Sequence, residues 1–269
     1  MAGDPWQTIA QHPVKSLGEL FEQEPDRLTA LSLDAAGLYF DWSKTHLDRG
    51  LLAAFDELAG ASGLADRREA LFSGAIVNPS EGRPATHVAE RGSGAPDDVE
   101  LARARRARMR ALVDAIEAEA FGPVAGILHI GIGGSLLGPA LLIDALGRRR
   151  SRYEVQFVSN VDPEAMAEAT ARLDPATTLV VVCSKTFTTL ETLSNMAAAV
   201  AWLAAGGVAD PFGRLIAVTA RPEAAVEQGI DETRVLQFGE GVGGRYSLWS
   251  AVGISAALAL GWSAFEELL

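Results

Sequence analysis

Residues 179–189 read LVVVCSKTFTT, an apolar run that changes abruptly into hydroxyl and ammonium side chains. A short, valine-rich apolar run is typical of a strand buried on both faces of a parallel sheet. The polar residues 184–189 then lie where the strand ends and a helix begins. Hydroxyls and backbone N–H groups at the start of a helix bind anions well. The stretch therefore predicts a buried strand that leads into an anion site.

Strand and helix patterns alternate around this segment, from residue 123 onward. The expected strands are 125–130, 154–159, 178–183, 214–219 and 234–238. The expected helices are 137–147, 163–172, 189–205, 222–228 and 246–260. Such alternation predicts an α/β fold in which a five-stranded parallel sheet carries helices on both faces. Ligands of such sheets bind outside the carboxyl ends of the strands.

The residues before this region predict a different organisation. Apolar side chains recur at helical spacing in 44–59 and 98–120, whereas 38–43 alternates weakly and is a possible strand. We therefore expect a mainly helical N-terminal segment over 1–120 and an α/β domain over 121–269.

Composition limits the classes of partner. The 269 residues include 35 acidic and 23 basic side chains, a formal charge of −12, which disfavours general binding to nucleic acid or anionic membranes.

The single cysteine, Cys183, excludes an intrachain disulfide and is expected to be a small core residue. The start shows no signal-peptide pattern, and the longest apolar run, near 251–262, is too short to span a bilayer. We expect a cytoplasmic protein.

The first motif is HIGIGGSLLGP at 129–139, between an expected strand and an expected helix. Glycines there let the backbone approach a ligand closely. A dinucleotide fingerprint would need glycine at position 136, which is Leu136, and no Gly-Lys-Ser/Thr follows as in a nucleotide-binding P-loop. The motif therefore favours a small ligand, with Ser135 as a hydrogen-bonding group. A tight turn without a ligand is the alternative.

The second motif is 184–189. Ser184, Thr186 and Thr189 can aim hydroxyls at one phosphate, with Lys185 beside them and the following helix adding its dipole. A plain helix N-cap is the alternative, but one cap needs a single hydroxyl.

The third motif is EGVGGRYSLWS at 240–250, where glycines precede Arg245 at the entrance of an expected helix. An arginine there can place a fixed charge over an oxygen that becomes negative during a reaction. An arginine that simply pairs with a carboxylate is the alternative.

Together, GIGGSLLGP, SKTFTT and GGRYSLWSAVG closely resemble the glucose-6-phosphate isomerase family. The segment 71–89 also looks like the N-terminal signature of that family, and the resemblance runs from about residue 38 to the end. It implies that 121–269 is the first of two sugar isomerase (SIS) domains, each a three-layer α/β unit. It implies no cofactor and no metal.

The resemblance also implies a role for each matched residue. Ser184, Lys185, Thr186 and Thr189 match the loop that binds the phosphate of the substrate. Gly134 and Ser135 match sugar contacts. Gly244 and Arg245 match the pair beside the reacting carbons, where the arginine stabilises a cis-enediolate.

Implied substrates are glucose 6-phosphate and fructose 6-phosphate, interconverted in glycolysis and gluconeogenesis by a homodimeric enzyme. Family members continue for roughly as long again, and their glutamate base, ring-opening histidine and late lysine lie in that further half. Neither Glu81, Glu191 nor Glu240 matches the base, and His87 and His129 are expected to be packed rather than catalytic. We expect an N-terminal part of the isomerase that lacks the base and the second SIS domain. A non-catalytic SIS-type phosphosugar-binding module and a phosphoglucose/phosphomannose isomerase remain alternatives.

Overall fold

The computed structural model describes residues 4–147 and 151–269. The chain divides into two compact units between Glu69 and Ala70, whereas the sequence predicts a boundary at residue 120. The long helix α6 (Pro96–Glu117) lies between these two positions. Its buried face, which includes Met109 and Val113, belongs to the same apolar core as the parallel sheet. The assignment of 121–269 to a SIS domain stays a prediction.

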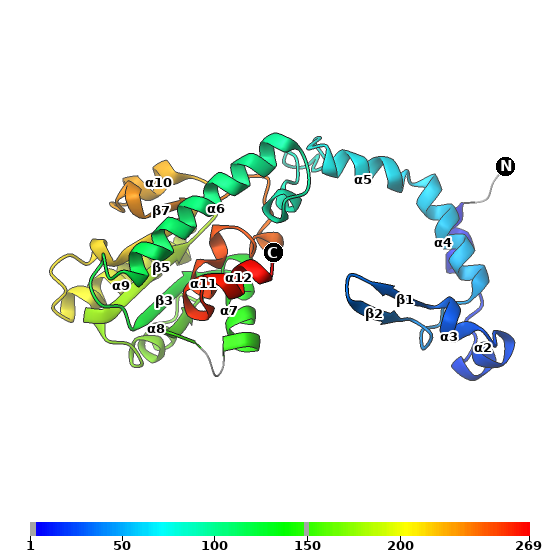
Figure 1. Ribbon diagram of the computed structural model, residues 1–269, viewed down its shortest axis with the longest axis horizontal. Helices are drawn as coiled ribbons and strands as arrows, with labels where there is room; N and C mark the ends of the chain where they lie inside the picture. Colours follow the sequence, from blue (N-terminus) through cyan, green and yellow to red (C-terminus); the bar gives the residue numbers. More distant parts are fainter. Residues whose placement is uncertain (1–3, 148–150) are drawn as a thin grey trace. The chain divides into compact units, whose positions relative to one another are not determined.

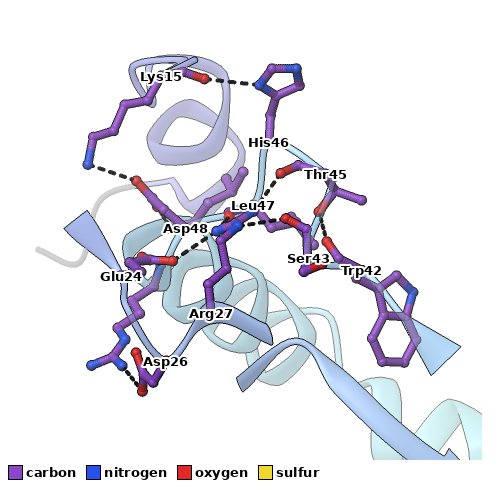
Figure 2. Close-up of polar contacts among 12 residues, drawn as sticks. Lys15, Glu24, Asp26, Arg27, Trp42, Ser43, Thr45, His46, Leu47 and Asp48 are labelled. Carbon is purple, nitrogen blue, oxygen red and sulfur yellow. Dashed lines mark hydrogen bonds and ion pairs between the residues drawn. The ribbon is translucent and has the colours of Figure 1, made fainter. Parts of the chain in front are cut away.

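The first unit combines short helices with one β-hairpin. Its elements are α1 (Pro5–Ala10), α2 (Leu17–Gln23), α3 (Arg27–Ala30), β1 (Ser32–Ala35), β2 (Leu38–Asp41) and α4 (Arg49–Ala61), and the boundary to the second unit lies within α5 (Leu64–Phe72). The expected helix at 44–59 begins only at Arg49, because the Asp48 carboxylate accepts a hydrogen bond from the Leu51 amide and caps it. The buried side chain of Arg27 lies at the centre of the polar contacts (Figure 2).

The second unit is built on a five-stranded sheet (Figure 1). Its strands are β3 (Gly126–Gly131), β4 (Glu154–Val158), β5 (Thr178–Cys183), β6 (Leu215–Thr219) and β7 (Val235–Gln237). They lie in the order β4-β3-β5-β6-β7, and all pairs are parallel. The fold and its five strands are confirmed. The chain changes direction across the sheet between β3 and β5, so the loops after these strands flank the switch point where ligands of such folds bind.

Helices cover both faces of this sheet. On one face, α6, α11 (Ile254–Leu260) and α12 (Trp262–Glu267) pack on the side chains that include Val181. On the other face, α8 (Pro163–Thr170), α9 (Leu190–Ala205) and α10 (Pro222–Glu227) pack on those that include Val180 and Val182. The valine run of β5 is therefore apolar throughout because each face has its own core.

The expected helix at 246–260 is wrong in its first half. The structure has 3₁₀ turns at Gly244–Tyr246 and Ala251–Gly253, and α11 begins only at Ile254. Two serines explain this: Ser247 Oγ donates to the Gly244 carbonyl at 2.7 Å, and Ser250 Oγ donates to the Ser247 carbonyl at 2.6 Å. Such local bonds compete with a regular helix.

The expected helix at 137–147 begins earlier, as α7 (Gly134–Leu142), and continues into a π-helical turn up to Gly147. This puts Gly134 and Ser135 in the first turn of α7. Across residues 4–147 and 151–269, no helix has the length and apolarity needed to cross a membrane.

Candidate functional site

The loop 184–189, here called the hydroxyl loop, turns sharply at the end of β5. Ser184 is buried, and its Oγ accepts a hydrogen bond from the Phe187 amide at 3.2 Å and lies 3.1 Å from Thr189 Oγ1. Phe187 has a φ of 54°, a left-handed conformation that costs about 1–2 kcal/mol. Its ring is buried in the core beneath α9, which offsets that cost. The structure therefore brings Ser184 and Thr189 together, as expected.

The start of α9 has no side-chain cap. Thr189 is the N-cap residue of this helix, yet its side chain accepts no hydrogen bond from the first turn. Thr186 and Thr188 are exposed, and the Thr188 hydroxyl donates to Thr186 Oγ1 at 2.8 Å. A plain N-cap role for the loop is thus not supported, because the cap bond is not made. Free N–H groups at the start of a 16-residue helix beside several hydroxyls favour an anion.

Lys185 joins the hydroxyl loop to the third motif. Its Nζ donates to the Val242 carbonyl at 3.3 Å. Burial lowers the pKa of the Lys185 ammonium, and the nearby Arg83 guanidinium lowers it further, whereas Glu81 and Glu240 oppose that shift. An anion bound beside Lys185 would stabilise the charged ammonium and so raise this pKa again.

This lowered pKa gives a pH-dependent prediction. The Lys185 charge should be lost on raising the pH through a value below its ordinary pKa of 10.5. Inorganic phosphate keeps one charge state above about pH 8, because its second pKa is near 6. We expect the affinity of the chain for phosphate to fall roughly tenfold between about pH 8 and 10.5, the value of one charged hydrogen bond. Calorimetric titration of wild type and Lys185→Met checks this; equal pH profiles for the two would contradict it.

The glycine loops at 131–135 and 240–246 touch through their backbones. A Cβ added to Gly134 would lie 2.2 Å from the carbonyl carbon and oxygen of Gly244. No side chain fits at Gly134, so the approach of these two loops requires glycine. Gly133, with a φ of 57°, makes the turn that precedes it.

Arg245 lies in the 3₁₀ turn Gly244–Tyr246 and is exposed. Within the described residues its guanidinium makes no hydrogen bond and no ion pair, so the carboxylate partner of the alternative interpretation is not observed there. Gly134, Gly244, Arg245 and apolar side chains of α7 line a pocket of about 310 Å³. The arginine is therefore available to a ligand.

Ser135 and the end of β5 both lie close to Gly131. Burial raises the pKa of the Cys183 thiol to about 12, and the Ser135 side chain opposes that shift. The Ser135 carbonyl lies 2.7 Å from Nε2 of His129, and Nδ1 of that imidazole lies 2.8 Å from Ser255 Oγ. Burial lowers the pKa of His129 to about 4, so the neutral ring donates from Nε2 and accepts from the Ser255 hydroxyl. The expectations of a packed His129 and a buried Cys183 are confirmed.

The third motif thus joins the other two. Gly244 contacts Gly134 of the first motif, and the Val242 carbonyl accepts a hydrogen bond from Lys185 of the second. The hydroxyl loop does not line the pocket beside Arg245. The arrangement can hold an anion at one end and a charged arginine at the other.

The three carboxylates considered as a base from the sequence either pair with an arginine or are exposed to solvent. Glu81 pairs with Arg83 at 2.8 Å, Glu240 pairs with Arg221 at 2.7 Å, and Glu191 is exposed in the first turn of α9.

The burial of one acid, Glu90, was not predicted from the sequence. Burial raises its pKa to about 7, and the arginines at 105 and 106 oppose that shift. The signal for its burial was its position directly after Val88 and Ala89, opposite the arginine-rich helix α6.

Comparison with known proteins shows which proteins this chain is similar to. Residues 41–269 match the family described as phosphoglucose isomerase. The chain belongs to the phosphoglucose isomerase family. Glucose-6-phosphate isomerases of Rhizorhabdus wittichii and Sphingopyxis alaskensis are 60% and 56% identical to it, over 98% and 100% of its length. The crystal structure of a glucose-6-phosphate isomerase from Chlamydia trachomatis superposes on 98% of this chain with a TM-score of 0.84 at 29% identity.

The match covers only part of these relatives. The chain spans about half the length of the curated relatives it matches, 53% and 54% of the first two, and 53% of the Chlamydia protein.

Proposed function

We propose that this chain forms the phosphate- and sugar-binding part of a glucose-6-phosphate isomerase, with glucose 6-phosphate and fructose 6-phosphate as substrates. One observation carries the proposal: the hydroxyl loop, at the uncapped start of α9, is bonded through Lys185 to the loop that carries Arg245, and that loop in turn contacts the glycine loop at 131–135. Membership of the phosphoglucose isomerase family supports the choice of substrate.

Ser184, Thr186 and Thr189 would hold the 6-phosphate with Lys185 and the amides of α9. The hydroxyls and amides donate hydrogen bonds, and the lysine adds the charge that an otherwise acidic chain needs locally. The phosphate lies far from the reacting carbons, so its binding energy serves to position them.

Gly134 and Ser135 would contact the sugar, and Gly244 and Arg245 would lie beside C1 and C2. In the aldose–ketose interconversion a base removes the C2 proton, a cis-enediolate forms, and the proton returns at C1. The negative charge of the enediolate needs a preorganised cation. Arg245 suits this role because no carboxylate neutralises it within the described residues.

Proton transfer needs a base, and we assign that role to none of the three carboxylates considered in this chain. Glu81 and Glu240 are held by arginines, and Glu191 matches no base position. We therefore expect the 269-residue chain alone to bind the sugar phosphate without turning it over. The whole enzyme would be cytoplasmic and homodimeric. A non-catalytic sensor is not favoured, because the close relatives are named as isomerases.

Thr189→Ala tests the phosphate site. The Thr189 side chain makes no cap bond and hydrogen-bonds only Ser184 Oγ, so the substitution should cost at most about 1 kcal/mol of stability, the value of one ordinary hydrogen bond. The affinity for 6-phosphogluconate, a phosphorylated six-carbon sugar acid, should fall roughly tenfold.

Thr170→Ala is the matched control, since its hydroxyl bonds only carbonyls within α8. Titration calorimetry and thermal melts measure both variants. A Thr189→Ala variant that loses stability but keeps its affinity would restore the plain-cap interpretation.

A further inference from the structure

The segment Arg83–His87, part of the N-terminal signature, packs against the loop that carries Arg245. The Thr86 amide donates to the Gly241 carbonyl at 3.0 Å. Nη1 of Arg83 donates to the Glu240 carbonyl at 3.2 Å. A Cβ on Gly241 would lie 2.7 Å from Thr86 Oγ1, so the two segments are in direct contact. The proposed function gives this segment no role.

His87 extends the contact to the residue next to Arg245. Its imidazole stacks on the Tyr246 ring with centroids 4.5 Å apart and an interplanar angle of 20°. The His87 side chain makes no hydrogen bond and no ion pair within the described part of the chain. Burial lowers the pKa of His87, so the ring is neutral near pH 7. The stack is thus the main specific contact of this half-buried side chain.

The turn that holds Arg245 needs an external support. Three of the four residues before Arg245 are glycines, in the run Gly241-Val242-Gly243-Gly244. A glycine-rich backbone loses much conformational freedom when it becomes ordered. Within the turn, the Tyr246 amide donates to the Gly243 carbonyl and the Ser247 amide to the Gly244 carbonyl. Tyr246 itself is half exposed.

We infer that His87 is a positioning residue for Arg245, which acts by stacking on Tyr246 and holding the Gly244–Tyr246 turn in place. This inference rests on the proposed function, because that function is the reason why Arg245 must be held in place. An arginine that stabilises a charge developing during the reaction is effective only when it is held in place before the reaction. The neutral ring supplies this order without adding a charge that would compete with the substrate.

Hydrogen exchange tests the positioning without any ligand. In the wild-type chain, in His87→Ala and in His87→Phe, mass spectrometry follows the amides of peptides that cover 240–247. Loss of one stacking contact, about 1 kcal/mol, should speed their exchange several-fold to tenfold in His87→Ala. His87→Phe, which keeps a flat ring, should restore the wild-type rate. Unchanged exchange in β5 shows that the unit stays folded, and unchanged exchange at 240–247 in His87→Ala would overturn the inference.

A double-mutant cycle then tests the link to Arg245. We expect His87→Ala and Arg245→Ala each to weaken binding of 6-phosphogluconate, whose carboxylate lies at the C1 end, about tenfold, and the double variant to be no weaker than Arg245→Ala. Such non-additivity marks coupled residues. Additive losses would overturn the positioning role.

Inorganic phosphate separates the two proposals. It should bind equally well to all these variants, since it reaches only the hydroxyl loop. If the wild-type chain failed to bind 6-phosphogluconate, the proposed function would fail. The exchange rates would still support or overturn the effect of His87 on the turn.

Discussion

Replacing Gly134 by alanine is expected to abolish measurable binding of 6-phosphogluconate and to destabilise the second unit by about 3 kcal/mol. The added Cβ would lie 2.2 Å from two backbone atoms of Gly244, and a backbone cannot move aside as a side-chain tip can. Overpacking of this kind costs about 1–3 kcal/mol. The forced separation would also pull Arg245 away from the loop at 131–135, so affinity and stability should fall together. Chemical denaturation and titration calorimetry measure the two effects.

Gly244→Ala is the matched control for stability, because it adds the same methyl group on the other side of the same contact. Its Cβ would lie 3.8 Å from the Cα of Gly134, an ordinary distance, and its backbone conformation does not require glycine. We expect a loss below about 1 kcal/mol. Equal destabilisation by the two substitutions would show that the loops do not meet as described.

The second large effect is expected in the first unit, from Arg27→Met. Arg27 is 1% exposed, and its guanidinium reaches three carbonyls and one carboxylate (Figure 2). Nε donates to the Ser43 carbonyl at 2.7 Å, and Nη2 to the Thr45 carbonyl at 2.5 Å. Nη1 donates to the Leu47 carbonyl at 2.6 Å and to Glu24 Oε2 at 2.8 Å. Methionine fills similar space but leaves four acceptors unpaired, which should cost about 3–5 kcal/mol.

Hydrogen exchange of peptides within residues 4–69 measures this loss separately from the second unit. Arg49→Met is the control, since its ion pair with Asp26 is 67% and 58% exposed and exposed pairs contribute about 0–1 kcal/mol. Because the proposed ligand site lies within the second unit, affinity for 6-phosphogluconate should be unchanged in both variants. Equal protection of 4–69 in Arg27→Met and Arg49→Met would contradict the proposed role of the buried arginine.

The sheet could be predicted because its signals are local. Each strand is a short apolar run between turn residues, and all five were expected within one or two residues of their observed bounds. The run at 179–183 is apolar at every position because each face of β5 meets a different helical layer. The hydroxyl loop was equally visible, since its residues are consecutive.

Other features depend on contacts between distant residues. Nothing near Gly134 in the sequence shows that it meets Gly244, and nothing near Thr86 shows that it bonds Gly241. The helix expected from residue 246 failed because serine side chains there bond the backbone, a choice that helix periodicity does not reveal. The boundary between the two units likewise depends on where α6 packs, not on its composition.

The central claim is that this chain holds a preformed site for a phosphorylated sugar. Titration calorimetry of the wild-type chain with 6-phosphogluconate, and with gluconate as the unphosphorylated control, tests it most directly. We expect saturable binding of one 6-phosphogluconate per chain, and affinity for gluconate at least about a hundredfold weaker, since two or more charge-assisted hydrogen bonds to the phosphate would be lost. No binding of 6-phosphogluconate at millimolar concentration, or equal binding of the two ligands, would contradict the account.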